Sequence, residues 1–308
     1  MFGGISPAGQ QFVNNVNNIQ SSLNQAEQQV STGFNLSQPS DAPDEVSPVL
    51  QLLTQIDQNQ SMNTNLTVVQ ANVNAAESAL SSSVDLLQSA STMAAEATGP
   101  NETASTRQAM AQSVQALMQE MVSNSQAQVN GQYVFSGDQS GAPLYQLNLD
   151  APNGVDKLGT ASNTNLVQLP DGSKVSVTLS ANSVFDDSDA AGVPTANNVF
   201  AALNGLRVAL LNNDTTGITN SMTALQSASN YMNTQLAKVG SSQNTISSAL
   251  TDNQNDEVQL RTQLSGLRDA NMVEAITALT QGQTQLQAAL SAQARLPTTT
   301  LFNFLPNS

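Results

Sequence analysis

The chain of 308 residues carries a net charge of −15 at pH 7, and only eight of its residues are Lys or Arg. Nucleic acids and anionic membranes bind clustered basic side chains, so this charge argues against both partners. The chain has neither Cys nor His, which removes disulfides, Cys/His metal sites and histidine general bases. We therefore expect neither an enzyme nor a protein that carries a metal or a cofactor.

Targeting signals are also missing from the sequence. No apolar run approaches the ~20 residues that a membrane-spanning helix needs. The N-terminus lacks the basic and apolar segments of a cleaved signal peptide. We expect a chain that stays in the cytoplasm or leaves the cell by a route without signal cleavage.

The first predicted element is a helix over residues 8–32 that ends at Gly33, a residue suited to a helix C-cap. Its apolar residues recur at steps of four and three: Phe12, Val16, Ile19, Leu23, Ala26 and Val30. Such steps form one stripe that packs against another helix. Pro39 and Pro43 follow, and they disfavour a continuous helix over this stretch.

Two long helices are expected next, over residues 44–98 and 105–129, with Gly99-Pro100 between them. The first keeps a stripe from Leu66 to Ala94. Because the turn is short, the two helices should form an antiparallel pair. Methionines on these stripes favour core packing over an adaptable binding groove.

The sequence changes to β character after residue 130. Residues 131–137 indicate a short strand bounded by glycines. Residues 166–169, a turn at Asp171-Gly172 and alternating apolar residues up to Leu179 predict a β-hairpin. Residues 138–195 therefore indicate a small insert.

Helix is predicted again from about residue 196, with a seam from Ile218 that continues through Leu267 into the terminal segment. There the apolar residues again recur at steps of four and three, with Gln283 as a gap: Met272, Ile276, Leu279, Leu286 and Leu290. The two ends of the chain thus carry matching seams. The two seams can pack against each other within one molecule or on other copies of the chain, and the pattern of the residues leaves both arrangements open.

We expect a mainly α fold with a small β insert. The architecture would be a nested helical rod, with terminal coiled-coil helices and an internal antiparallel bundle. Its expected parts are an N-terminal assembly helix and turn (1–43), an N-terminal rod arm (44–137), a β-rich outer insert (138–195), a C-terminal rod arm (196–252), and a C-terminal assembly helix and tail (253–308).

Two acidic groups are candidates for chemistry. Asp186-Asp187-Ser188-Asp189 with Gly192 could bind calcium, but its spacing is not that of an EF-hand, and a solvated loop is the expected interpretation. Asp256 and Glu257, near the expected start of the last helix, are adjacent and so cannot face each other. They indicate a solvated helix face.

Motifs at both ends resemble the bacterial flagellin superfamily. The helix 8–32, Ser31-Thr32-Gly33 and the run Pro39-Ser40-Asp41-Ala42-Pro43 resemble its N-terminal region, and the run is most similar to the hook-associated protein 3 branch. Gly131, Tyr133, Phe135 and Gly137 match that branch's segment before the β domain. Arg268-Asp269-Ala270-Asn271 is similar to the superfamily's Arg-Asp-[Ala/Val]-Asp, with Asn271 in place of the usual acid. The tail, including residues 286–290 and 301–305, resembles the same branch.

The resemblance implies a structural subunit of the bacterial flagellum that is exported by the type III system without signal cleavage. It would polymerise through its terminal helices at the hook–filament junction, as an adaptor between hook-associated protein and flagellin filament. The implied partners are copies of itself, those two neighbours and an export chaperone. Two alternatives stay open: a flagellin filament subunit, and a surface glycan-binding protein that uses the insert, where Tyr145 and Phe185 are the aromatic residues.

The expected assembly interface consists of apolar residues near the two ends: Phe12, Val16, Ile19, Leu23, Val30, Leu264, Leu267, Met272, Ile276, Leu279, Leu286, Leu290, Leu301, Phe302 and Phe304. Ordering some 50 residues costs ~1–2 kcal/mol each, which offsets the burial of these side chains in one chain. We therefore expect the ends to be loose in a free monomer and to order on assembly.

Overall fold

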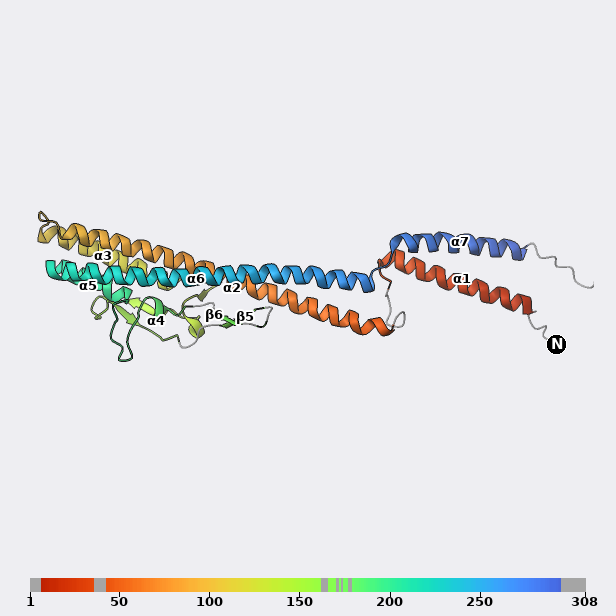
Figure 1. Ribbon diagram of the computed structural model, residues 1–308, viewed down its shortest axis with the longest axis horizontal. Helices are drawn as coiled ribbons and strands as arrows, with labels where there is room; N and C mark the ends of the chain where they lie inside the picture. The colour runs from red at the N-terminus through yellow and green to blue at the C-terminus, as the bar shows by residue number, and fades with distance from the viewer. Residues whose placement is uncertain are drawn as a thin grey trace, which may run out of the picture. The chain divides into compact units, whose positions relative to one another are not determined.

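The structure, a computed structural model, describes residues 7–35, 43–161, 166–169, 172, 174–176 and 179–294. It divides into two compact units, Met1–Asn59 with Asp256–Ser308, and Gln60–Asn255. Helices α2 (Pro43–Ala97) and α6 (Thr215–Arg268) contribute to both units (Figure 1). The expected mainly α fold with a small β insert is confirmed, whereas the five-part division stays a prediction.

In the first unit, α1 (Pro7–Thr32) and α7 (Met272–Ala294) lie side by side and run in opposite directions (Figure 1). The predicted helix 8–32 is confirmed, and so is its C-cap. Gly33 has φ +77, a conformation that few other residues adopt, and its amide donates to the carbonyl oxygen of Gln29 at 2.9 Å. The described chain therefore pairs its ends within one molecule, in contrast to the loose ends expected for a monomer.

In the second unit, the predicted helices around Gly99-Pro100 are confirmed as α2 and α3 (Ala104–Ser125). Thr103 and Thr106 form a capping box at the start of α3. The expectation that this helix reaches residue 129 is wrong, because β1 (Gln128–Val129) pairs with β2 (Gln132–Tyr133) around Asn130-Gly131. Both turn residues have positive φ, as a tight hairpin requires. Of the strand predicted over residues 131–137, only Gln132–Tyr133 forms a strand, β2.

The insert consists of short antiparallel pairs. The predicted hairpin is confirmed as β5 (Leu166–Gln168) and β6 (Lys174–Ser176), in which Val167 lies opposite Val175. A second pair, β3 (Tyr145–Leu147) with β4 (Val155–Lys157), was not predicted. The insert also contains a 3₁₀ turn, η1 (Gly137–Gln139), and the short helix α4 (Ala181–Val184).

The helical region after the insert is interrupted twice. It begins with α5 (Val199–Leu211), capped by the Asn198 side chain, and breaks before α6 where Asn213 has φ +52. The expected continuation of α6 into the terminal segment is wrong, because α6 ends at Arg268. Asp256 and Glu257 consequently lie inside α6, where Glu257 forms an ion pair with Arg261 at 2.7 Å.

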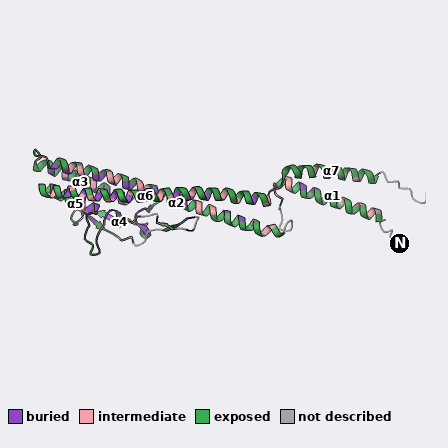
Figure 2. Ribbon diagram, viewed as in Figure 1, coloured by how far each residue is buried: buried purple, intermediate pink, exposed green. Residues whose placement is uncertain are grey.

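The main hydrophobic core lies in the second unit. The described parts of α2, α3, α5 and α6 supply aliphatic side chains, and Met118, Met121 and Met232 are buried among them. Four buried aromatic rings join the insert to these helices: Phe135, Tyr145, Phe185 and Phe200. Figure 2 shows buried residues concentrated here, whereas α1 and α7 are mostly exposed. A search of the described helices found none with the length and apolar character needed to span a membrane.

Candidate functional site

The seam of α1 faces α7 in the structure. Leu23 and Ala26 are buried, at 8% and 3% exposure. The other predicted seam residues of α1 are half-buried, namely Phe12, Val16, Ile19 and Val30. The N-terminal stripe thus packs as a helix seam along the described length of α1.

The stripe of α7 that packs on α1 differs from the predicted one. Ala275 and Gly282 are buried, and Leu279, Leu286 and Ala289 are half-buried. These five positions also follow steps of four and three, so they share one face of α7. Ala275, Gly282 and Ala289 carry small side chains or none, so the spacing of the large apolar residues in this segment did not indicate them.

Three predicted seam residues of α7 remain exposed. Met272, Ile276 and Leu290 are 40%, 50% and 54% exposed. At 100° per residue they lie on one flank of the stripe that packs on α1, with Gln283 between them. We call these four residues the α7 flank. The C-terminal pattern is therefore split between a face that the chain itself covers and a flank that it leaves open.

A short antiparallel bridge joins the two ends of the chain. The Asn35 amide donates to the carbonyl oxygen of Arg268 at 2.7 Å, and the Ala270 amide donates to that of Gly33 at 2.9 Å. Phe34 and Asp269 are the paired residues between them. We call residues 33–35 and 268–270 the clasp. It ends α6, and Asn271 then accepts from the Val273 and Glu274 amides to begin α7.

Side chains reinforce the clasp. The Arg268 guanidinium carbon lies 4.1 Å from the centroid of the Phe34 ring, within the range of cation–π attraction. Asp269 accepts from the Ser265 hydroxyl at 2.7 Å and pairs with Arg268 at 3.4 Å. Gly33 and the Arg-Asp pair, which belong to motifs at opposite ends of the sequence, therefore meet in one place.

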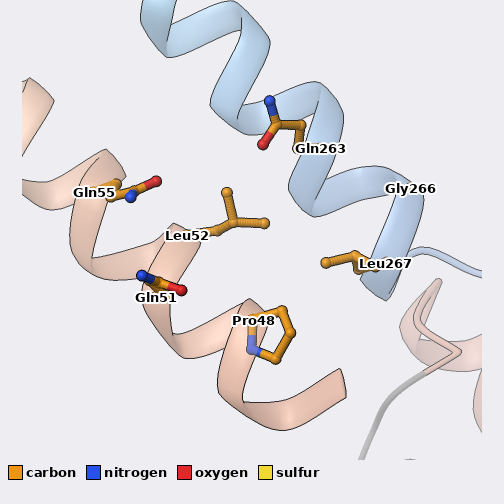
Figure 3. Close-up of a pocket in the computed structure, with 7 residues that line it drawn as sticks. All are labelled: Pro48, Gln51, Leu52, Gln55, Gln263, Gly266 and Leu267. Carbon is orange, nitrogen blue, oxygen red and sulfur yellow. The ribbon is translucent and has the colours of Figure 1, made fainter. Parts of the chain in front are cut away.

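Next to the clasp, the beginning of α2 packs on the end of α6. Leu52, Ile56 and Leu264 are buried there, and Leu267 packs against them. Two residues expected at the assembly interface, Leu264 and Leu267, are thus already covered in part by the same chain. Beside them lies a groove of about 570 Å³, shown in Figure 3.

The remaining motif residues are dispersed. Gly131 lies in the β1–β2 turn, Tyr133 is half-buried in β2, Phe135 is in the core and Gly137 begins η1. Pro43 is the first residue of α2. Six predicted residues lie outside the described part of the chain: Pro39, Ser40, Asp41, Leu301, Phe302 and Phe304.

The expectation of a solvated acidic loop is wrong for Asp186, which is 6% exposed. Its carboxylate accepts from Asn198 at 2.8 Å and from Asn153 and the Tyr145 hydroxyl at 3.2 Å. Burial, and then the charge of Asp186, raise the pKa of Tyr145. Among the described residues no group of acidic side chains is arranged to hold a metal ion. The carboxylate thus has a structural role within the insert.

Both end regions of the chain match known protein-family regions. The bacterial flagellin N-terminal helical region matches residues 8–140, and the bacterial flagellin C-terminal helical region matches residues 222–305. The chain belongs to the bacterial flagellin family. The predicted resemblance is therefore confirmed, and in this family member the clasp joins segments from both matched regions.

Solved structures of similar fold include proteins of several bacteria. A flagellar hook-associated protein of Vibrio parahaemolyticus has a TM-score of 0.62 and 17% identity, covering 74% of this chain and 100% of its own. Bacillus cereus FlgL gives 0.55 and 17%, over 71% and 100% of the two chains. Hook-associated protein-3 of Legionella pneumophila gives 0.61 and 13%, over 71% and 98%. At these identities the likeness concerns the fold. A search of curated proteins found no match.

The glycan-binding alternative gains no support from these comparisons. Its two aromatic candidates, Tyr145 and Phe185, are 1% and 0% exposed and belong to the core. A sugar ring stacks on an exposed aromatic face, which neither side chain offers.

Proposed function

We propose that this chain is a structural subunit of the bacterial flagellum that polymerises through its terminal helices at the hook–filament junction. It would act there as an adaptor between a hook-associated protein and the flagellin filament, outside the cell. Its partners would be copies of itself, these two neighbours and, before assembly, an export chaperone. Family membership supports the flagellar role, and the names of the similar structures support the junction.

The open α7 flank is the observation that carries the proposal. Covering the exposed parts of its three large apolar side chains would stabilise a contact by about 1 kcal/mol each. That gain is small for one contact, but a subunit in a helical lattice meets several neighbours. The flank is the natural place for a further helix because it continues the seam that α1 and α7 already share.

The distribution of charge along the chain also favours α1 and α7 as the contact surface between copies. Helices α1 and α7 contain one charged residue each, Glu27 and Glu274, whereas the whole chain has a net charge of −15. Copies of a strongly acidic chain repel one another. A contact through the two nearly neutral helices therefore carries the smallest electrostatic cost.

The central test is Ile276→Asp. Ile276 is half-exposed and lies beside the seam, so the variant should keep its helix content by circular dichroism. It should lose assembly, and cells that carry it in place of the wild-type chain should not swim. Gln281→Asp, at an exposed position on the other side of the seam, is the matched control and should swim normally. Normal motility of Ile276→Asp would count against the proposal.

A second test separates the junction from the filament. An epitope tag in the exposed loop 190–193 of the insert leaves the core untouched. Immunogold labelling should then give one short band at the hook end of the flagellum. Label along the whole filament would instead identify a flagellin subunit, which is the runner-up.

A further inference from the structure

The groove beside the clasp is uncharged and partly apolar. Its lining residues come from the start of α2 and the end of α6: Pro48, Gln51, Leu52, Gln55, Gln263, Gly266 and Leu267. Figure 3 shows the Leu52 and Leu267 side chains between the two helices, with glutamines around them. At about 570 Å³ the groove has the size of a site for a ligand or a few side chains.

Gly266 leaves room in the groove. A Cβ atom at this position would meet no atom within 4 Å among the described residues. Glycine inside a helix costs about 1 kcal/mol relative to alanine. At this position it leaves a space in the groove that a side chain from another segment can fill.

The chain contains a segment of matching chemistry after α7. Residues 301–305 are Leu-Phe-Asn-Phe-Leu, with four large apolar side chains and no charge. Aromatic and aliphatic anchors in an uncharged pocket are the usual centre of a protein interface. In an acidic chain, an uncharged segment and an uncharged groove can meet without like-charge repulsion.

The tail after α7 is too short to place residues 301–305 in the groove of the same molecule. Helix α7 has 23 residues and is about 33 Å long. From Ala294 the fully extended chain reaches at most ~25 Å at Leu301 and ~36 Å at Phe304. Even Phe304 therefore reaches no farther than about the first turn of α7. The groove lies beyond that turn, since in this unit α7 leads away from the end of α6 and packs on α1 (Figure 1).

We infer that the groove binds residues 301–305 of a second copy of this chain, with Phe302 or Phe304 over Gly266. The contact joins two different surfaces, so it can repeat from copy to copy. It rests on the proposed function, in which copies meet, and it adds a specific contact between the tail of one subunit and the α2–α6 groove of the next.

Binding can be measured on the unassembled full chain with a fluorescein-labelled peptide of residues 297–308. Fluorescence polarisation should give saturable binding. Gly266→Leu, which fills the groove, should weaken it at least about tenfold, as loss of an anchor does. Gly266→Ala adds one methyl group and is the matched control, which should bind the peptide as the wild type does. A peptide with Phe302→Ser and Phe304→Ser should not bind.

Cross-linking gives a second readout without filling the groove. The chain has no Cys, so Gln263→Cys in one copy and Asn303→Cys in another provide one thiol each. Mixing and mild oxidation should give a disulfide-linked pair. Val258→Cys, on the other side of α6 and 64% exposed, is the control and should not cross-link with the tail.

The outcomes of these experiments distinguish a failure of the tail–groove contact from a failure of the proposed function. Equal peptide affinity in wild type and Gly266→Leu, absence of saturable binding, or equal cross-linking of Val258→Cys would overturn the inference. If Ile276→Asp still abolished assembly, the proposed function would stand without it. If the peptide bound but Ile276→Asp assembled normally, the groove would stand and the α7 flank would be the wrong interface.

Discussion

Leu23 of α1 lies against Gly282 of α7, so closely that a Cβ atom at Gly282 would come within 3.2 Å of the Leu23 Cγ. A large residue on one helix thus fills the space left by the smallest residue on the other. This fit fixes the register in which the two ends of the chain pair.

Gly282→Leu should therefore weaken the pairing of α1 with α7. Overpacking a close contact costs about 1–3 kcal/mol, which outweighs the gain in helix propensity. Hydrogen exchange measured by mass spectrometry should show faster exchange of the α1 amides. Gly240→Leu is the control, because a Cβ there meets no atom within 4 Å among the described residues. Unchanged exchange in Gly282→Leu would contradict the register argument.

Ala270→Pro should open the clasp. Proline has no amide hydrogen, so the bond to the Gly33 carbonyl oxygen is lost, at about 1 kcal/mol or somewhat more. The Asn35 amide should then exchange faster because its partner strand is less well held. Ala270→Ser keeps the amide and should exchange like the wild type. Equal protection in the two variants would show that the side chains of Arg268 and Phe34 hold the clasp alone.

Arg107→Met should destabilise the second unit. The buried Arg107 donates through Nε to the Ala97 carbonyl oxygen at 2.9 Å and through Nη1 to the Asn213 side chain at 2.6 Å. It therefore connects the end of α2 with the turn between α5 and α6. Loss of these charge-assisted bonds should lower the free energy of unfolding by about 2–3 kcal/mol in urea titrations. A loss below 0.5 kcal/mol, the usual size for a surface substitution, would refute this role.

Alkaline pH should destabilise the fold through Tyr145. Burial and Asp186 raise its pKa in the folded state, so the folded chain keeps a proton that the unfolded chain loses above pH ~10. The stabilising contribution is complete below that pH and declines as the pH rises above it. Urea unfolding at pH 8 and pH 11 should show the decline.

Tyr145→Phe should reduce this pH dependence. At neutral pH the variant should also lose about 1–2 kcal/mol, because the hydroxyl donates to Asn182 at 2.7 Å and lies 3.2 Å from Asp186. Tyr133→Phe, at a half-buried position in β2, is the control. An unchanged alkaline decline in Tyr145→Phe would assign the effect to other groups, of which Tyr231, whose pKa burial and Asp187 also raise, is the first candidate.

Helices with long periodic patterns were predictable, and so was the β5–β6 hairpin, but the β3–β4 pair was not. The helices around Gly99-Pro100 agree with their predictions, apart from the C-terminal end of α3, because many apolar residues repeat the same period. The β3–β4 pair was missed because its three-residue strands carry almost no periodic signal, whereas the apolar alternation around Asp171-Gly172 continues up to Leu179 and indicated the other hairpin. Its one available sign was Asn153-Gly154, where Gly154 has φ +81. The split of the last helical region at residues 269–271 depends on pairing with Phe34, a contact distant in sequence.

Local sequence alone determined the family, the helical class and the apolar stripes at both ends, because helix periodicity and motif order are properties of neighbouring residues. Only the tertiary structure decided which part of each stripe is covered. It places Ala275 and Gly282 against α1 and leaves Ile276 open, since burial depends on which side of a helix its partner occupies. It also brings Gly33 and Arg268 together in the clasp and leaves space above Gly266, because these relationships arise where distant segments meet.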